Sequence, residues 1–167
     1  MKNGGSELIE QNKKRLSIKS MYFNRYLLVR YVSALFFFTN LYWLISLIMS
    51  DSSLFFIPLV LLIVLLFSVA EQAKIFSNHT NNAKYTIYCF MVLLITNVGL
   101  VVPTSFSSMF TQLYPFLVNQ PKSKILVLSI LVIGILLSVL IIKRLNRIKH
   151  NEDKHYKRIK KYEGAIN

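Results

Sequence analysis

Four long apolar stretches, separated by short polar segments, limit the folds open to this chain. They span residues 31–49, 54–70, 85–103 and 125–142, and none contains Asp, Glu, Lys or Arg. A helix needs about 20 residues to cross a hydrocarbon core of about 30 Å. Lipid offers no hydrogen-bond partner to an exposed backbone, so each spanning stretch must be helical. We therefore expect an all-α integral membrane protein, a four-helix bundle within residues 31–142.

Four buried helices of a water-soluble protein are the alternative reading of the same stretches. Such helices would show a polar face at a period of 3.6 residues, and these stretches do not. With 167 residues, of which 54% are hydrophobic, the chain is also too short to add a sizeable soluble domain. The pattern therefore favours a multi-pass membrane protein.

Positive charge is concentrated in segments that four crossings would place on one side. Residues 1–30 carry seven Lys and Arg, residues 71–84 carry two, and residues 143–167 carry nine. The segments on the other side carry only Lys122 and Lys124. By the positive-inside rule, both the N-terminus and the C-terminus are expected in the cytoplasm, at the plasma membrane. Topology thus accounts for most of the net charge of +13, and no nucleic-acid partner is expected.

Both terminal segments are expected to bind the anionic inner leaflet. Residues 1–30 place aromatic rings beside cations just before the first span, as the headgroup region favours. Residues 143–167 predict a basic amphipathic helix that lies on lipid; docking to an acidic partner is the alternative. The apolar face of that helix is formed by Tyr156, Ile159, Tyr162 and Ile166. The expected inner-leaflet anchors are Arg25, Arg30, Lys143, Arg144 and Arg147.

The segments between spans have expected roles of their own. Ser52 and its neighbours are suited to cap the second span. Glu71 and Gln72 are expected to reach headgroups and Lys74 at the end of that span. The outer loop 104–124 repeats apolar residues at spacings of three and four, which predicts a short helix against lipid or the bundle. A recognition surface for a partner is the alternative for this loop.

Few polar groups fall within the spans, so each is a candidate contact. Asn40 and Asn97 lie at depths that differ by about 4.5 Å and are expected to link the first and third spans. Trp43 and Ser46 share the face of Asn40. A substrate site at the two amides is the alternative. Gly134 and Ser138 form a small-xxx-small pair, which allows close packing within the bundle or with another subunit.

Residue patterns typical of catalysis are missing from the sequence. There is no carboxylate pair near the spans, no Gly-rich phosphate loop and no metal-ligand spacing among His79, His150 and His155. Cys89 is the single cysteine, which excludes a redox pair. Proton-coupled transport generally needs an ionisable group inside the membrane, and the spans have none. We expect no enzymatic activity, no cofactor and no metal.

The run RLSIKSMYFNRY at residues 15–26, followed by four spans, resembles small uncharacterised membrane proteins of low-GC Gram-positive bacteria. The likeness extends over the whole chain and implies a bacterial source. Some of those proteins are labelled as sugar phosphotransferase components. Neither terminal segment is large enough for a phosphocarrier domain, so the residues argue against that chemistry here.

These observations favour a non-enzymatic accessory or regulatory subunit that binds a larger membrane partner, such as a transporter or an envelope-assembly enzyme. Bulky apolar spans with few functional polar groups suit a scaffold better than a pore. A small transporter or permease built by self-association is the first alternative, with a role in sugar uptake as one form of it. A membrane immunity protein against a toxin is the second.

Overall fold

The computed structural model describes residues 3–78 and 82–166, and this part of the chain is helical with no strand. The prediction of an all-α protein is confirmed. The elements are α1 (Asn3–Arg25), α2 (Leu27–Met49), η1 (Ser53–Phe55), α3 (Phe56–Asn78), α4 (Lys84–Ser105), α5 (Ser107–Leu113), α6 (Pro121–Lys149) and α7 (Lys154–Ile166).

Four of these helices are long and apolar enough to cross a membrane: α2, α3 together with η1, α4 and α6. In the most apolar window of each, only 28% of the residues are buried against the rest of the protein. Large apolar side chains such as Phe38, Ile95 and Leu136 therefore face outward, at more than half of their full exposure. Lipid removes such surface from water, so a four-helix membrane bundle is the architecture that accounts for it.

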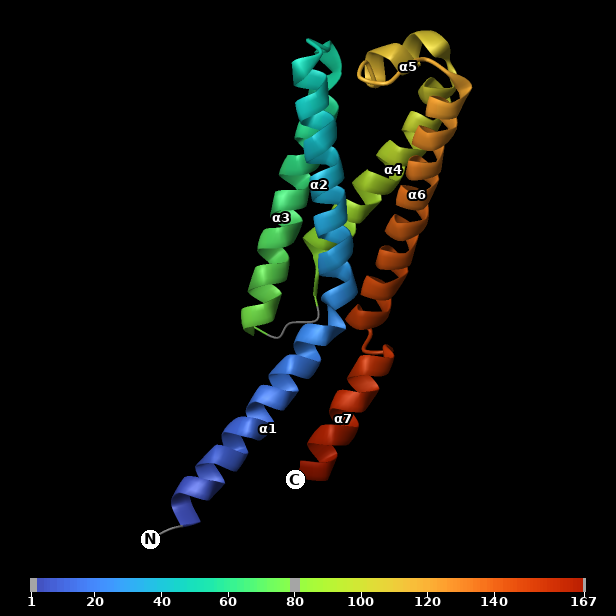
Figure 1. Ribbon diagram of the computed structural model, residues 1–167. Coiled ribbons are helices and arrows are strands. Elements are labelled where there is room, and N and C mark those ends of the chain that lie inside the picture. The colour runs from blue at the N-terminus through green and yellow to red at the C-terminus, as the bar shows by residue number, and fades with distance from the viewer. Residues whose placement is uncertain (1–2, 79–81, 167) are drawn as a thin grey trace.

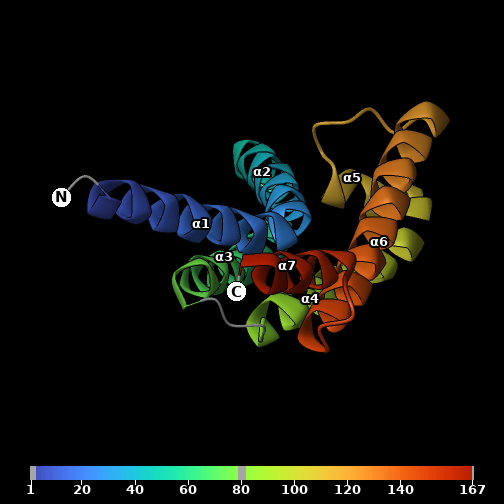
Figure 2. The same cartoon turned by 90° about the horizontal axis from the view of Figure 1, so that it is seen from below.

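The four helices pack as two pairs (Figures 1 and 2). α2 and α3 form an antiparallel hairpin, and α4 packs most extensively against α6. α3 also contacts α4 and joins the two pairs. Phe36 of α2 meets Phe90 of α4 edge to face, with the ring centroids 6.0 Å apart, inside the main apolar core. Loss of such a buried ring typically costs about 3–5 kcal/mol.

One end of the bundle is closed by α5 and the turn between α2 and η1 (Figure 1). The short helix predicted in the outer loop is present, and its apolar face packs on the bundle, since Phe110 and Leu113 are buried. The indole N–H of Trp43 donates to the carbonyl of Leu113 at 2.9 Å, and its ring stacks on Tyr114 at 5.7 Å. Ser52 caps η1 as predicted, by accepting from the N–H of Leu54.

At the opposite end, α1 and α7 extend beyond the bundle and lie side by side (Figures 1 and 2). We call these two helices the arm. The chain turns from α1 into α2 at Tyr26, whose backbone leaves helical geometry there. α6 ends at Lys149 and α7 begins at Lys154, so a short turn returns the chain to α1.

Candidate functional site

The structure places its densest polar network where the arm joins the bundle, around Arg25. This side chain has no exposed surface. Its Nε donates to both carboxylate oxygens of Asp153, at 3.0 and 3.1 Å, and one terminal nitrogen donates to the same group. That nitrogen also donates to the Asn151 side-chain oxygen at 2.9 Å and to the Ile148 carbonyl at 3.0 Å. The Tyr156 ring covers the guanidinium, with 5.1 Å from Cζ to the centroid.

The turn between α6 and α7 positions these acceptors. Asn151 adopts a left-handed backbone, with φ at 57°, which Asn tolerates better than most residues. The N–H of Glu152 then donates to the carbonyl of Arg147 at 2.9 Å and closes the end of α6. Asp153 accepts from the N–H of Tyr156 at 3.1 Å, so it caps α7 while it binds Arg25.

A second arginine ties α6 to the end of α1. Arg144 donates to the main-chain carbonyl of Arg25 at 3.3 Å, an acceptor left over where α1 ends. The junction thus joins α1, α6 and α7 through two cations and one carboxylate. Burial alone would raise the pKa of the Asp153 carboxyl, but the hydrogen bonds and charge of Arg25 outweigh it and lower that pKa. The carboxylate stays ionised as a result.

The structure corrects two predictions about the terminal segments. Arg25 is not a headgroup anchor, because its side chain is enclosed by α6 and α7. The apolar face of the tail helix covers α1 rather than lipid: Ile159 is 1% exposed and Tyr162 is half-buried. Ile166 lies outside the side chains that the structure describes.

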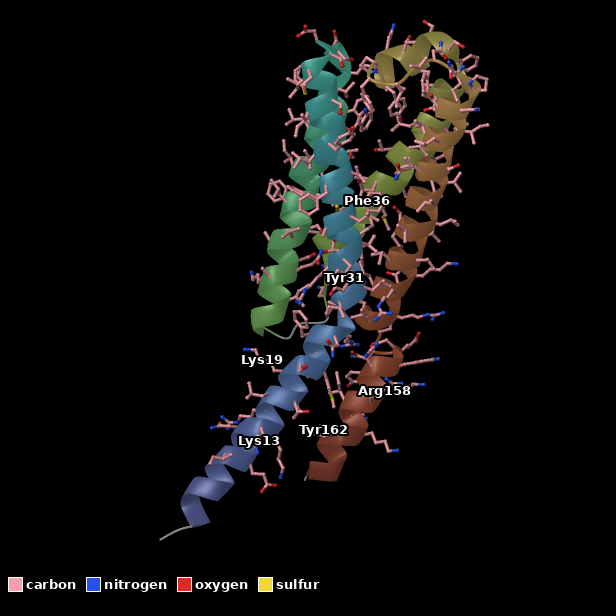
Figure 3. All side chains as sticks on the ribbon, in the orientation of Figure 1. Lys13, Lys19, Tyr31, Phe36, Arg158 and Tyr162 are labelled. Carbon is pink, nitrogen blue, oxygen red and sulfur yellow. The ribbon has the colours of Figure 1, made fainter. Side chains whose placement is uncertain are left out.

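With the apolar face covered, the arm presents cations on its outer surface (Figure 3 labels several of them). The exposed ones are Lys13, Arg15, Lys19, Lys154, Lys157, Arg158, Lys160 and Lys161. Between them lie isolated apolar side chains, of which Leu16 is 65% exposed. The surface is therefore suited to an acidic counterpart with some apolar contact.

A second polar group lies inside the bundle, near the arm. The side-chain amide of Gln72 donates to the hydroxyls of Ser33 at 3.0 Å and Ser68 at 3.1 Å. All three side chains are buried. The expectation that Gln72 reaches headgroups is wrong, because its amide turns inward to link α3 with α2.

Glu71 also departs from its expected contact with headgroups and Lys74. Its carboxylate accepts from the N–H of Thr86 at 2.7 Å, the hydroxyl of Thr86 at 2.8 Å and the N–H of Tyr85 at 3.1 Å. These N–H groups lie in the first turn of α4, where orphan donors and the helix dipole favour a negative charge. Glu71 thus fixes the start of α4 against the end of α3.

The two intramembrane asparagines do not meet. Asn40 donates to the carbonyl of Phe36 in its own helix at 2.8 Å, and within the described residues no hydrogen bond joins it to Asn97. Asn97 lies instead against Gly134 of α6, where a β-carbon would come within 3.0 Å of its side-chain nitrogen. The expected link between the first and third spans is absent because Asn97 packs against α6, while the contact between α2 and α4 is made elsewhere, at Phe36 and Phe90.

The remaining predicted contacts have separate places. Ser46 donates to the carbonyl of Tyr42 within α2, at 2.8 Å, while Trp43 binds α5. Gly134 and Ser138 are both buried in α6, and the hydroxyl of Ser138 donates to the carbonyl of Gly134 at 2.8 Å. Gly134 therefore serves contact within the bundle.

The predicted anchors other than Arg25 surround the junction. Arg30 lies over the ring of Phe23, with 4.1 Å from Cζ to the centroid. Lys143 and Arg147 are exposed on α6, and Arg144 is half-buried through its bond to α1. Sequence reasoning missed Asp153 entirely. The sequence does show that Asp153 follows Asn151 at the start of a helix, which predicts an N-terminal cap. This local pattern does not predict a contact with Arg25.

Comparison of the chain with models of protein families, with curated proteins and with solved structures found no match. Among the residues that the structure describes, no group of three His, Cys, Asp or Glu is placed to hold a metal ion. By its geometry the site is a cationic protrusion of two helices, α1 and α7, joined by the buried contact of Arg25 with Asp153.

Proposed function

We propose that this chain is a non-enzymatic accessory or regulatory subunit of a bacterial plasma membrane, and that it binds a larger membrane protein through the arm. The observation that carries the proposal is the buried Arg25–Asp153 pair, which holds two basic helices in one fixed arrangement. A flexible polybasic tail is sufficient to bind an anionic leaflet. A preformed surface instead lowers the entropy lost on binding a specific protein.

Charge and shape support a protein partner with an acidic surface. The exposed cations of the arm lie on two helices at once, and α1 carries the arm away from the bundle (Figure 1). The 23 residues of α1 correspond to a length of about 35 Å. This reach favours a partner whose own domain stands on the same side of the membrane as the arm.

The polar groups inside the bundle support a scaffold rather than a conduit. The Gln72 amide donates to the hydroxyls of Ser33 and Ser68, and Asn40 donates to a carbonyl of its own helix. A translocation path would need polar side chains that turn toward a shared channel. These inward-directed contacts therefore favour a scaffold over a permease.

Site-specific photo-crosslinking in native membranes tests the proposal. A photoreactive residue at Leu16, on the exposed surface of α1, is expected to give one discrete adduct with a membrane protein. The matched control is Leu136, which is 59% exposed on the apolar surface of α6 and is expected to give none. Charge reversal in the variant Lys13→Glu, Arg15→Glu should abolish the adduct.

Other results would favour the other functions. Solute flux into proteoliposomes that contain this chain alone would contradict the accessory role and support a permease. Toxin sensitivity on deletion, without an adduct at Leu16, would support an immunity protein. Equal adducts at Leu16 and Leu136 would show that the arm has no specific role.

A further inference from the structure

A groove of about 460 Å³ opens between α2 and α3 at the end of the bundle near the arm. Its polar end is formed by Arg30, Ser33 and Gln72, and its remaining walls are apolar. Phe23 of α1 closes that end, so three helices contribute to one site. This groove is separate from the outer surface of the arm.

The position of the groove relative to the spans follows from its own contacts. The hydrogen bond from Gln72 to Ser33 sets these residues of α3 and α2 at the same height. Arg30 lies three residues, or about 4.5 Å along the helix, closer to the arm. The apolar run of α2 begins directly after it. Arg30 therefore stands where the hydrocarbon core gives way to the headgroup region.

The polar end of the groove carries a positive charge in a defined place. Arg30 is the charged residue among the described residues that line the groove. Its guanidinium lies over the Phe23 ring at 4.1 Å, which holds it at the mouth of the groove. Arginine binds phosphate through several donors in a planar fork.

The apolar part of the groove faces sideways, away from the bundle core. Phe38, Leu66 and Val69 line it and are 66%, 54% and 45% exposed. Ala34, a small exposed residue, leaves room between these larger side chains. A chain of methylene groups fits such a channel, because it would be continuous with the surrounding hydrocarbon.

We infer that this groove is a binding site for one anionic phospholipid, with its phosphate at Arg30 and an acyl chain along α2 and α3. The charge complementarity at one end and the apolar walls at the other select this amphiphile over a soluble anion. The site does not depend on the proposed partner of the arm. The bound lipid fills the space between α1, α2 and α3.

Native mass spectrometry of the full-length protein in mild detergent tests the inference. Phosphatidylglycerol and phosphatidylcholine with the same acyl chains are titrated in parallel. Phosphatidylglycerol is expected to bind more tightly to the wild-type protein. Arg30→Gln should weaken its binding about fivefold, which corresponds to the roughly 1 kcal/mol per cation found near anionic lipid. Arg30→Lys should retain most of the binding.

Two further variants make the test specific. Lys149→Gln removes an exposed cation at the same end of the bundle, outside the groove, and should leave binding unchanged. Ala34→Trp fills the apolar channel but keeps Arg30, and should weaken both lipids. It also keeps the inference testable if Arg30→Gln fails to fold, which size-exclusion chromatography would reveal.

Three results would overturn the inference. They are equal affinity of the wild-type protein for the two lipids, unchanged binding in both Arg30→Gln and Ala34→Trp, or an equal loss in Lys149→Gln. The last would mean that general basic charge, and not the groove, attracts the lipid.

Discussion

Arg25 shows how a single buried charge can determine the geometry of an arm. Removing a guanidinium from water costs several kcal/mol, which only close acceptors can offset. Asp153 supplies the negative charge, and the Asn151 and Ile148 oxygens supply further acceptors. Arg25 can therefore be buried between these helices only if Asp153 stays beside it. The pair sets the direction of α7 against α1 more strictly than apolar contact alone would.

We predict that Asp153→Asn destabilises the folded protein by about 3 kcal/mol. Loss of one partner from a buried ion pair typically costs 3–5 kcal/mol, and the remaining acceptors of Arg25 favour the low end. Unfolding of the purified protein by SDS titration, followed by circular dichroism, gives the measurement. Glu152→Gln is the matched control, since this neighbouring acid is exposed and should change little. Equal stability of the two variants would contradict the role of the pair.

The same pair should make the arm sensitive to acid. The pKa of Asp153 is lowered by folding, so its contribution to stability is complete above the unfolded pKa of about 3.9. As the pH falls through the folded value, Asp153 is protonated and that contribution is lost. Spin labels at Leu16→Cys and Lys157→Cys should report a constant distance from pH 7 down to the unfolded pKa of about 3.9, and a broad distribution only once the pH has fallen below the lowered pKa of the folded protein. In Asp153→Asn the acid transition should be absent.

The sequence contained the residues of this junction but not their contact. Arg25 and Asp153 are 128 positions apart, and nothing in a local pattern pairs them. An arginine beside aromatic rings, just before a span, is also what a headgroup anchor looks like. The turn at Asn151 directs α7 back along α1 and brings Asp153 to Arg25. This turn, and no local pattern around Arg25, distinguishes a buried ion pair from a headgroup anchor. Long-range pairs of this kind depend on the whole chain path.

At the scale of helices, the close approach of α4 and α6 depends on Gly134. An added β-carbon there would lie 3.0 Å from the side-chain nitrogen of Asn97. We predict that Gly134→Leu destabilises the protein by about 1–3 kcal/mol, the usual cost of overpacking. Thermal unfolding in detergent is the measurement. Gly99→Leu, on α4 with nothing within 4 Å of its β-carbon, is the control and should be near neutral.

A double variant separates side-chain contact from helix separation. Asn97→Ala removes the atoms that Gly134 approaches, so Gly134→Ala should cost less in that background than alone. Strictly additive losses would show that Asn97 does not set the distance between α4 and α6. They would also remove the packing role that the structure gives to its amide.

The helices themselves were largely predictable, for a physical reason. Lipid requires long apolar helices, so the four spans and the short α5 follow from composition and periodicity. The neighbours of each helix were not predictable, because every span is apolar on all sides. Asn40 and Asn97 were expected at similar depths, yet Asn97 packs against Gly134 of α6 and Asn40 binds a carbonyl of its own helix. For α7, an amphipathic face predicts burial without saying whether lipid or protein covers it.

At the scale of the whole molecule, the two ends of the bundle differ in charge, and this difference bears on the orientation of the protein in the membrane. The arm, with both termini, lies at one end of the bundle, and α5 lies at the other (Figure 1). Among the residues that the structure describes, every Lys and Arg except Lys122 and Lys124 belongs to a segment at or near the arm end. From the positive-inside rule we therefore predict an orientation with the arm in the cytoplasm and α5 outside.

Thiol labelling of intact cells with a membrane-impermeant maleimide tests this orientation. The single native cysteine, Cys89, is 1% exposed and should remain unlabelled. We predict that Ser108→Cys, on exposed α5, reacts in intact cells, whereas Lys157→Cys, on exposed α7, reacts only after permeabilisation. The opposite pattern would place the arm outside. Labelling of both sites in intact cells would mean that the arm and α5 are not separated by the membrane, which this bundle does not allow.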